Sequence, residues 1–540
     1  LNAMTMDGTD GPELVANWTW AGALFTAEQI QELAQTWFQA LEALVAYAAQ
    51  PHVGGLTPSD VPLVKLNQEQ IEQLEAEQPE IEEIWPLSPL QKGLLFHALY
   101  DPQSADAYVT QLVLDLEGAV DGQALRHACQ TLLQRHANLR ASFVYQGLDE
   151  PVQVIARDVQ LPWQELDLSG LSDAAQEAEC ARFLQEDGSR RFELRQSPSL
   201  RFSLIRLTAC RHRLVLTCHH ILMDGWSGLL FVQEMFELYA NSGSGRTLPR
   251  VAPYRDYLIW LKGRDYAAAK HAWQSALAGL DEATRLAPAQ LKSLVRQQTL
   301  NWDLPESLTY ALTQQARQHR LTLNTLIQGA WGLLLSHLTA RDDVVFGVTV
   351  SGRPPELPGV EHMIGLLINT LPLRLQASPK QPIADLLTAI QDQQTQLVEY
   401  QYLALSDIQR LTGLGELFDT LIVFENYPVN WQALQTTTGG LQLTKLSGSD
   451  TTHYSLSLVV APGARLSFHL GYRCDLFNNK TVEQLMRRFN RLLEAIAQDP
   501  GQPIGGIELL EAAERQQLLV EWNATERAMP EATLVQLFEA

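Results

Sequence analysis

Hydrophobic residues recur along this chain with two different periods, and the alternation between the periods predicts strands and helices. Short apolar runs bounded by turn residues are typical of strands, and longer segments with apolar residues three or four apart are typical of amphipathic helices. In the first half the expected strands are Tyr108–Leu116, Ala141–Tyr145, Val152–Ala156, Phe202–Leu207 and Arg213–Cys218, and the expected helices are Gly122–Arg135, Asp173–Asp187 and Ser227–Ala240.

A second round of strands and helices follows in the C-terminal half. Pro462 and Gly463 separate two of its strands and predict a hairpin turn. Two similar rounds predict an α/β body with two lobes, and a cleft between lobes is a common place for a binding site. The expected strands of the second round are Val344–Val350, Thr420–Glu425, Ser455–Val460 and Leu466–Tyr472, and its helices are Pro305–His319, Leu323–Leu338, Ile383–Glu399 and Lys480–Gln498.

One pattern of a strand followed by a helix occurs near both ends of the chain. The apolar face of residues 25–44 recurs at residues 477–496, with a constant shift of 452 residues. Any strand followed by an amphipathic helix would look similar, but the constant shift favours a repeat. We therefore expect the N-terminal residues to be the tail of an upstream homologous domain, and the complete copy to end near residue 510.

Composition narrows the class of protein. A length of 540 residues allows about three or four compact units, and 46% apolar residues can form a core. The net charge of −23 argues against nucleic acid and anionic membranes as partners, because both are negatively charged. No apolar run approaches the ~18–20 residues of a membrane helix, and the first residues do not form a signal segment.

The cysteines suggest a compartment. There are 5 of them, an odd number, and none forms a C-x-x-C pair. A reduced, cytoplasmic setting without disulfides or a zinc site is therefore expected. Leu1–Met4 looks like a cloning remnant, so the chain is expected to be an excised piece of a larger protein.

The most informative segment follows the strand expected at 213–218. His219 and His220 are separated by three residues from Asp224 and Gly225. Because successive side chains of a strand point to opposite faces, one histidine is expected to face the cleft and the other to be structural. An imidazole with a pKa of about 6.5 can take up a proton near neutral pH or stabilise a developing charge by a hydrogen bond, and the sequence leaves both roles open.

The residues after the histidines suggest how the loop is built. Asp224 could orient the imidazole as in a catalytic triad, and Gly225 lets a substrate approach the backbone because it lacks a Cβ. Ser227 is expected to be the N-cap of the next helix rather than a nucleophile. No G-x-S-x-G elbow occurs, so direct transfer between two bound substrates is favoured over a covalent acyl-enzyme.

The segment from His219 to Gly225 resembles the HHxxxDG signature of condensation domains of nonribosomal peptide synthetases. Further blocks resemble other motifs of that family in the expected order. Singly each block is weakly specific, but this order together with the histidine motif is highly specific. The blocks are Trp85–His97, Arg135–Arg140, Tyr254–Leu261 and Ile364–Pro372, the last with Leu367 in place of the usual Phe.

The resemblance implies roles for individual residues. His220 would be the catalytic histidine, and His219, Asp224 and Gly225 would complete the catalytic motif. The family pattern makes the aspartate structural, held by a buried arginine, for which Arg353 is the candidate. The expected substrate-binding residues are Asn369, Ser227 and Trp226, with a turn cap before Pro372 as the alternative role of the asparagine, and the expected structural arginines besides Arg353 are Arg135 and Arg140.

The same resemblance implies a fold and a reaction. The fold would be α/β, with two chloramphenicol-acetyltransferase-like lobes, at 84–262 and 263–510, in a V-shaped pseudo-dimer with a central tunnel. Segments near 345–375 and 425–455 would bridge the lobes. The reaction would join a donor aminoacyl or peptidyl thioester to an acceptor aminoacyl thioester. Both would be carried on the phosphopantetheine arms of carrier proteins, and the domain itself would bind no cofactor and no metal.

The flanking segments suggest neighbours in a synthetase. Thr57–Leu63 resembles the TPSDFPL that ends epimerization domains. Residues 1–65 would then be the tail of such a domain, 66–83 a linker, and 511–540 the lead-in to an adenylation domain. A condensation domain that follows an epimerization domain commonly joins a D-configured donor to an L-configured acceptor. The product would be a peptide such as an antibiotic or a siderophore.

Other interpretations stay open. An epimerization domain shares the histidine motif but usually lacks the glycine that this chain has at Gly225. A heterocyclizing relative replaces the first histidines with aspartates, whereas this chain keeps both. A non-catalytic recruitment platform would be expected to have a damaged motif. A free CoA-dependent acyltransferase would not explain the flanking segments.

Overall fold

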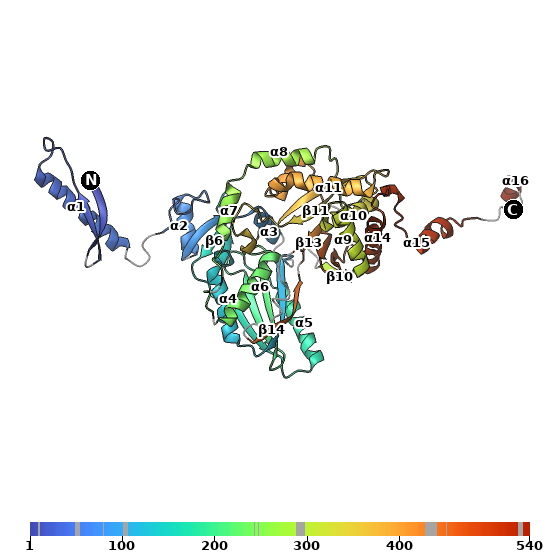
Figure 1. The fold of residues 1–540 in the computed structure, drawn as a ribbon, viewed down its shortest axis with the longest axis horizontal. Coiled ribbons are helices and arrows are strands. Elements are labelled where there is room, and N and C mark those ends of the chain that lie inside the picture. The colour runs from blue at the N-terminus through green and yellow to red at the C-terminus, as the bar shows by residue number, and fades with distance from the viewer. Residues whose placement is uncertain are drawn as a thin grey trace. The chain divides into compact units, whose positions relative to one another are not determined.

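The computed structural model describes residues 1–8, 11–48, 55–78, 80–100, 106–241, 243–246, 248–287, 297–426, 440–449, 451–526 and 533–539. The chain divides into two compact units, Leu1–Pro79 and Glu80–Ala540, and each is described by itself. Figure 1 labels their helices and strands. Within the described ranges, no helix is long and apolar enough to cross a membrane.

The first unit begins with a hairpin and a long helix. Strands β1 (Asn2–Gly8) and β2 (Gly11–Asn17) pair antiparallel, and α1 (Ala27–Ala48) follows them. The sequence predicts a strand at Ala16–Trp20 before this helix, whereas β2 starts and ends earlier. Although α1 carries an apolar face, none of its residues is buried.

Helix α2 lies within the segment expected to be a linker. It spans Gln68–Glu77 and starts with a capping box, in which Asn67 and Gln70 each accept a hydrogen bond from the backbone N of the other. Much of this Glu- and Gln-rich segment is therefore helical. Strand β3 begins at Ile81, inside the expected linker 66–83.

The first lobe of the second unit is built around two sheets, with strand orders β14-β4-β9-β8-β7 and β3-β6-β5. Helices α4 and α6 pack together, and Leu132 and Phe231 on them are fully buried. The strands are β3 (Ile81–Pro86), β4 (Val109–Gly118), β5 (Ala141–Val144), β6 (Val152–Ala156), β7 (Trp163–Asp167), β8 (Leu200–Arg206) and β9 (Arg211–His219). The helices are α3 (Pro89–Tyr100), α4 (Gly122–Arg135), α5 (Asp173–Ser189), α6 (Gly225–Ala240) and α7 (Tyr254–Lys262).

The second lobe is built on a six-stranded sheet of order β10-β16-β15-β13-β11-β12. Its central strands β11, β13 and β15 run parallel, and helices α9, α10 and α14 pack on one another. The strands are β10 (Gln297–Asp303), β11 (Asp343–Val350), β12 (Asn369–Gln376), β13 (Thr420–Phe424), β15 (Leu456–Ala461) and β16 (Ser467–Arg473). The helices are α8 (Tyr266–Ala276), α9 (Glu306–Gln318), α10 (Leu323–Thr339), α11 (Ile383–Leu397), α12 (Leu405–Thr412) and α14 (Asn479–Gln498).

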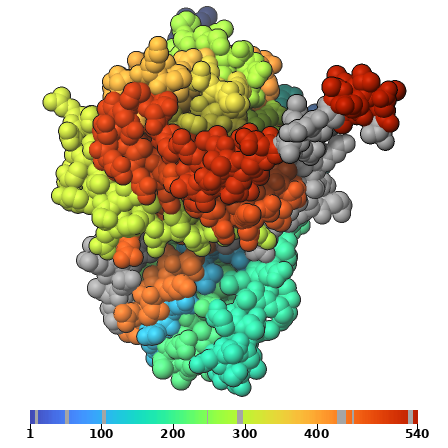
Figure 2. All heavy atoms as spheres, turned by 90° about the vertical axis from the view of Figure 1, so that its right-hand side faces the viewer, coloured from blue at the N-terminus to red at the C-terminus, as the bar shows by residue number. Residues whose placement is uncertain are grey.

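One strand leaves the second lobe and joins the sheet of the first. Strand β14 (Leu441–Ser449) pairs antiparallel with β4, although more than 300 residues separate them. Figure 1 shows β14 in orange beside the blue β4, and Figure 2 shows atoms of the same colours in contact. This strand lies in the segment 425–455 that was expected to bridge the lobes, of which residues 427–439 lie outside the described part.

Four short elements follow α14 among the described residues. They are a 3-10 helix (Ile504–Gly506), α15 (Ala512–Gln516), a π-helix (Gln517–Glu521) and α16 (Leu534–Glu539). The expected lead-in 511–540 includes residues 527–532, which lie outside the described residues.

Candidate active site

Strand β9 places the two histidines in different environments. His219 is the last residue of the strand and is fully buried, whereas His220 follows it and lies in the wall of a cavity. The alternation of side chains along a strand accounts for the difference. One imidazole therefore lies inside the fold and the other faces open space.

Protein groups meet both ring nitrogens of His219. The backbone N of Ile221 donates to Nδ1 at 3.1 Å, and Nε2 lies 3.2 Å from Oδ2 of Asp106. Because Nδ1 accepts, the ring hydrogen is on Nε2 and faces the carboxylate. Burial raises the pKa of Asp106, but the His219 ring and the backbone N of Tyr108 outweigh burial and hold the pKa below its ordinary value. His219 therefore braces the loop.

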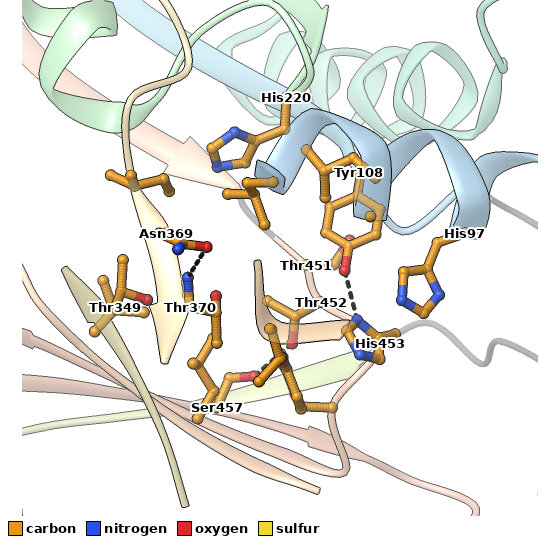
Figure 3. A pocket seen from close by; sticks show the side chains of 18 of the residues that line it. His97, Tyr108, His220, Thr349, Asn369, Thr370, Thr451, Thr452, His453 and Ser457 are labelled. Atoms are coloured by element: carbon orange, nitrogen blue, oxygen red, sulfur yellow. Dashed lines mark hydrogen bonds between the residues drawn. The ribbon is translucent and has the colours of Figure 1, made fainter. Parts of the chain in front are cut away.

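The ring of His220 makes fewer polar contacts with protein than the ring of His219. Its backbone N donates to the carbonyl oxygen of Tyr108 at 2.8 Å, which fixes the main chain. Its Nδ1 is buried and has no hydrogen-bond partner among the described residues. Figure 3 shows His220 at the pocket, with Tyr108, Asn369 and His453 around it. No described residue bonds its Nε2, so that nitrogen is the one available to a substrate.

Both lobes line the cavity that His220 faces, and its volume is about 1090 Å³. A space of this size is typical of sites that enclose a whole small-molecule substrate. Lining residues of the first lobe come from α3, from the start of β4 and from the start of α6. Those of the second lobe come from its central sheet and the adjoining loops. Residues near the histidine motif that line the cavity include His97, Tyr108, Gly225, Trp226, Arg353 and Asn369.

Asp224 uses both carboxylate oxygens to join the lobes. Its Oδ1 accepts from the backbone N of Ser227 at 2.8 Å and from Nη2 of Arg353 at 3.2 Å. Its Oδ2 accepts from the backbone N atoms of Leu367 at 3.0 Å and Ile368 at 3.3 Å. The arginine suggested by the sequence is thus beside Asp224, and both side chains are buried. With its oxygens directed at protein, Asp224 holds the loop and does not orient His220.

The expectation that Ser227 caps the helix is wrong. Asp224 is the N-cap of α6, and Ser227 lies three residues later, fully buried. Its hydroxyl donates to the carbonyl oxygen of Gly365 at 2.8 Å and accepts from Nη2 of Arg353 at 3.0 Å. Among the described lining residues of the cavity Ser227 is absent. Its hydroxyl therefore contacts protein, and a contact with substrate, as the sequence suggested, has no support here.

Gly225 and Trp226 open helix α6 at the edge of the cavity, and both line it. The indole Nε1 of Trp226 donates to the carbonyl oxygen of Glu361 at 3.0 Å. The guanidinium carbon of Arg353 lies 4.7 Å from the centroid of the Trp226 ring, within the range of a cation–π contact. Trp226 thus covers the Arg353–Asp224 pair and presents an apolar surface to the cavity.

Asn369 lines the cavity at the start of β12, and protein groups occupy most of the hydrogen-bonding capacity of its side-chain amide. Nδ2 donates to the carbonyl oxygens of Gln401 at 2.8 Å and Leu403 at 2.9 Å, and Oδ1 accepts from the backbone N of Thr370 at 3.0 Å. Its contacts brace the neighbouring loop. A substrate contact is limited to the second lone pair of Oδ1.

The two other expected structural arginines lie away from the cavity. Nε of Arg135 lies 2.9 Å from Oε2 of Glu234, and its Nη2 donates to the carbonyl oxygen of Pro249. Arg140 is almost fully buried, and its Nη1 lies 2.6 Å from Oε2 of Glu82. Both side chains contact carboxylates and carbonyl oxygens of the first lobe.

Three residues near the histidine motif were not predicted from the sequence. Asp106 meets His219, and Tyr108 and His453 meet each other in the cavity wall. Asp106 and Tyr108 lie just before β4, and no local pattern distinguishes them. His453 lies 345 residues after Tyr108, so only the fold reveals their contact.

Comparisons with known sequences identify a family and relatives. The model of the condensation domain matches residues 81–519. One of the linear gramicidin synthase proteins of Brevibacillus parabrevis is 36% identical over 542 residues, which cover 98% of this chain and 7% of that protein. Bacitracin synthase 3 of Bacillus licheniformis is 31% identical over 550 residues, covering 100% of this chain and 9% of that protein. The chain thus spans less than a tenth of these relatives.

Solved structures with the same fold include two domains from antibiotic biosynthesis. The first condensation domain of the calcium-dependent antibiotic synthetase matches with a TM-score of 0.67 and 21% identity, covering 79% of this chain and 99% of that one. The X-domain from teicoplanin biosynthesis matches with a TM-score of 0.68 and 22% identity, covering 79% and 97%. At these identities the likeness shows the fold, and the expected two-lobed α/β fold of the chloramphenicol-acetyltransferase type is confirmed.

Proposed function

Because the chain belongs to the condensation-domain family, we propose that it forms a peptide bond between a donor acyl thioester and an acceptor aminoacyl thioester. Both substrates arrive on the phosphopantetheine arms of carrier proteins. The observation that carries this proposal is the position of His220, whose ring lies in the wall of a cavity shared by two lobes and whose Nε2 has no described partner.

The transfer is direct. The acceptor amine attacks the thioester carbon, a C–N bond forms and the C–S bond breaks, and the donor arm leaves as a thiol. One amine proton must be removed, and His220 either accepts it or stabilises the tetrahedral intermediate by a hydrogen bond. The first hydroxyl after the motif, that of Ser227, is buried and bonded to Gly365, which supports a mechanism without an acyl-enzyme.

Residues 1–65 belong to an upstream homologous domain in this proposal. Helix α1 begins 452 residues before α14, and an antiparallel hairpin precedes each helix. Leu33 is 52% exposed and Leu44 63%, whereas the matching Leu485 is 5% exposed and Ile496 0%. An apolar face that one copy buries and the other leaves uncovered supports the assignment of this segment to a domain of the same fold.

The donor is D-configured and the acceptor L-configured. This proposal rests on Thr57–Leu63, whose sequence resembles the end of epimerization domains. An epimerization domain upstream would deliver a D-aminoacyl or D-peptidyl group to this cavity.

The remaining flanks connect neighbouring domains. The part of the expected linker that precedes β3, residues 66–80, connects the two units, and 511–540 act as the lead-in to an adenylation domain. The 5 cysteines are all free, which supports a reducing, cytoplasmic setting. The net charge of −23 supports protein partners rather than nucleic acid or membrane.

A reconstitution with loaded carrier proteins tests the proposal. The donor carrier is charged in parallel with the D- and the L-enantiomer of each of several amino acids, and the acceptor carrier with L-amino acids. Intact-protein mass spectrometry then follows each carrier, and chiral chromatography follows the released product. We expect a dipeptidyl group on the acceptor carrier, with the D-donor preferred over the L-donor by at least about tenfold, equal to ~1.4 kcal/mol.

Other outcomes identify the alternatives. Loss of stereochemistry on one carrier without transfer indicates an epimerization domain. Carrier binding without chemistry indicates a recruitment platform, a role consistent with the fold because the related X-domain has been solved in complex with OxyB. Acyl transfer from free CoA indicates an independent acyltransferase. Any of these results replaces the proposed condensation.

A further inference from the structure

A second group of ring side chains lines the cavity beside His220. Tyr108 lies just before β4, His453 lies between β14 and β15, and His97 lies on α3. Oη of Tyr108 is 2.5 Å from Nδ1 of His453, and the rings of His97 and His453 stack with centroids 4.1 Å apart. Figure 3 shows these three residues and His220 at the same pocket.

The hydrogen of the His453 ring is on Nε2. A phenol is a stronger acid than an imidazole N–H, and an imidazole nitrogen is a stronger base than a phenol oxygen, so Tyr108 donates to Nδ1. Burial raises the pKa of Tyr108 well above its ordinary value, which keeps it a phenol. Burial lowers the pKa of His453 well below its ordinary value, and the neighbouring His97 lowers it further. The ring is therefore neutral at pH 7.

This arrangement leaves a fixed donor in the cavity wall. Among the described residues no acceptor meets Nε2 of His453. The segment that carries it is tied to the first lobe, because the hydroxyl of Thr451 donates to the carbonyl oxygen of Ala107 at 2.6 Å. Tyr108 is itself bonded through its carbonyl oxygen to the backbone N of His220. Tyr108 thus holds both His220 and His453 in place.

We propose that Nε2 of His453 donates a hydrogen bond to a carbonyl oxygen of a thioester-bound acyl substrate. Tyr108 and His97 are positioning residues, because Tyr108 fixes the tautomer and His97 fixes the plane of the ring by stacking. Acyl substrates of a peptide synthetase are rich in carbonyl oxygens. A neutral N–H in a partly desolvated wall orients such a group more strongly than it would in water. The inference rests on the proposed function, which supplies this substrate.

Two substitutions of His453 separate a substrate contact from a contact between lobes. Glutamine carries its amide nitrogen to the position of Nε2, whereas asparagine carries its amide to the position of Nδ1, where Tyr108 reaches. We expect His453→Gln to stay within about threefold of the wild-type kcat/KM, and His453→Asn to fall by about tenfold, the effect of one lost hydrogen bond. Varying donor and acceptor separately shows which substrate makes the contact.

The variant Tyr108→Phe tests the tautomer. Without the phenol, some molecules carry the hydrogen on Nδ1, so the rate at pH 7.5 should fall by about three- to tenfold. The NMR shifts of the two ring nitrogens of His453 distinguish its neutral forms, and the variant should contain more of the Nδ1–H form than wild type. The other titratable groups facing the pair are His97 on α3, and Tyr454 and Asp106 nearby. An Nε2–H form that is equally populated in the variant and in wild type contradicts the role of the tautomer.

A nonreactive probe makes the test independent of turnover. N-acetyl-D-alanyl and L-alanyl pantetheine amides, with nitrogen in place of the thioester sulfur, represent donor and acceptor. By calorimetry, one of them should bind His453→Asn about tenfold more weakly than wild type or His453→Gln, and the exposed His271→Ala should match wild type. Equal binding by all variants, tighter binding by His453→Asn than by His453→Gln, or no binding by wild type overturns the inference. Wild type that binds the probe but makes no peptide overturns only the proposed function.

Discussion

At the scale of residues, the site is organised by which polar atoms are already bonded to protein. Nδ1 of His219 and both carboxylate oxygens of Asp224 accept hydrogen bonds from protein, and Nε2 of His219 lies 3.2 Å from the Asp106 carboxylate, so these residues brace the loop. His220 and His453 each keep Nε2 without a described partner in the cavity wall. The remaining hydrogen-bonding capacity therefore separates the residues that can meet a substrate from those that support them.

The contacts of Asp224 should contribute to the free energy of unfolding. Asp224→Ala leaves the Arg353 guanidinium buried without its carboxylate, and the free energy of unfolding should fall by about 3–5 kcal/mol. Urea denaturation measures the loss. The double variant Asp224→Ala/Arg353→Met should recover at least ~1 kcal/mol, because it removes the unpaired charge. If Asp224→Ala alone is as stable as wild type, the role assigned to Asp224 is contradicted.

At the scale of elements, strand β14 connects the two lobes and positions the segment that follows it. Its pairing with β4 runs from Leu441 opposite Gly118 to Ser449 opposite Gln111. His453 lies four residues beyond the end of this ladder. Gly118 has a φ of 126°, and a Cβ there would lie 2.3 Å from the carbonyl oxygen of Gly440. Only glycine fits this position without moving the strand.

Gly118→Ala should therefore loosen β14. The clash and the unfavourable φ should cost about 1–3 kcal/mol, concentrated at the end of the ladder. Hydrogen exchange measured by mass spectrometry should become faster in residues 441–449. Gly170→Ala is the matched control, since nothing lies within 4 Å of a Cβ at that exposed glycine. Unchanged exchange in β14 would show that the glycine is dispensable.

The periodicity of apolar residues within a segment was enough to predict many helices and strands. The helix expected at 122–135 has those bounds in the structure, and the strand expected at 420–425 spans Thr420–Phe424. Strand β14 was not predicted as a strand, because its partner β4 lies in the other lobe and pairing carries no local signal. The cap of α6 was misassigned because both Asp224 and Ser227 suit an N-cap, and only geometry distinguishes them. The contact of Tyr108 with His453 could not be predicted either, because it joins residues 345 positions apart and carries no local signal.

At the scale of the whole second unit, one cavity collects residues from both lobes, and two histidines in its wall have lowered pKa values. Burial lowers the pKa of His97 despite the opposing charge of Asp106, and it lowers the pKa of His453 further. Burial also lowers the pKa of His212, in β9. Stability is therefore linked to pH through groups that bind protons more weakly in the folded state.

The sign of this linkage gives a prediction. Below about pH 6.5 the unfolded chain binds more protons at these histidines than the folded chain, so the free energy of unfolding should fall as pH falls. Each histidine contributes at most ~1.4 kcal/mol per pH unit. Urea midpoints at pH 7.5 and 5.5 measure the change, and His453→Gln should show a smaller one. Asp106 contributes nothing in this window, since its lowered pKa matters only below about pH 4. Equal or greater stability at pH 5.5 would contradict the account.

The most direct test of the central claim is the single-turnover rate of peptide formation between loaded donor and acceptor carriers. The account predicts that His220→Ala lowers this rate by at least about a hundredfold while its melting temperature stays that of wild type, and that the exposed His271→Ala changes neither. A folded His220→Ala protein that forms peptide at the wild-type rate would contradict the claim that this imidazole serves the reaction in the cavity.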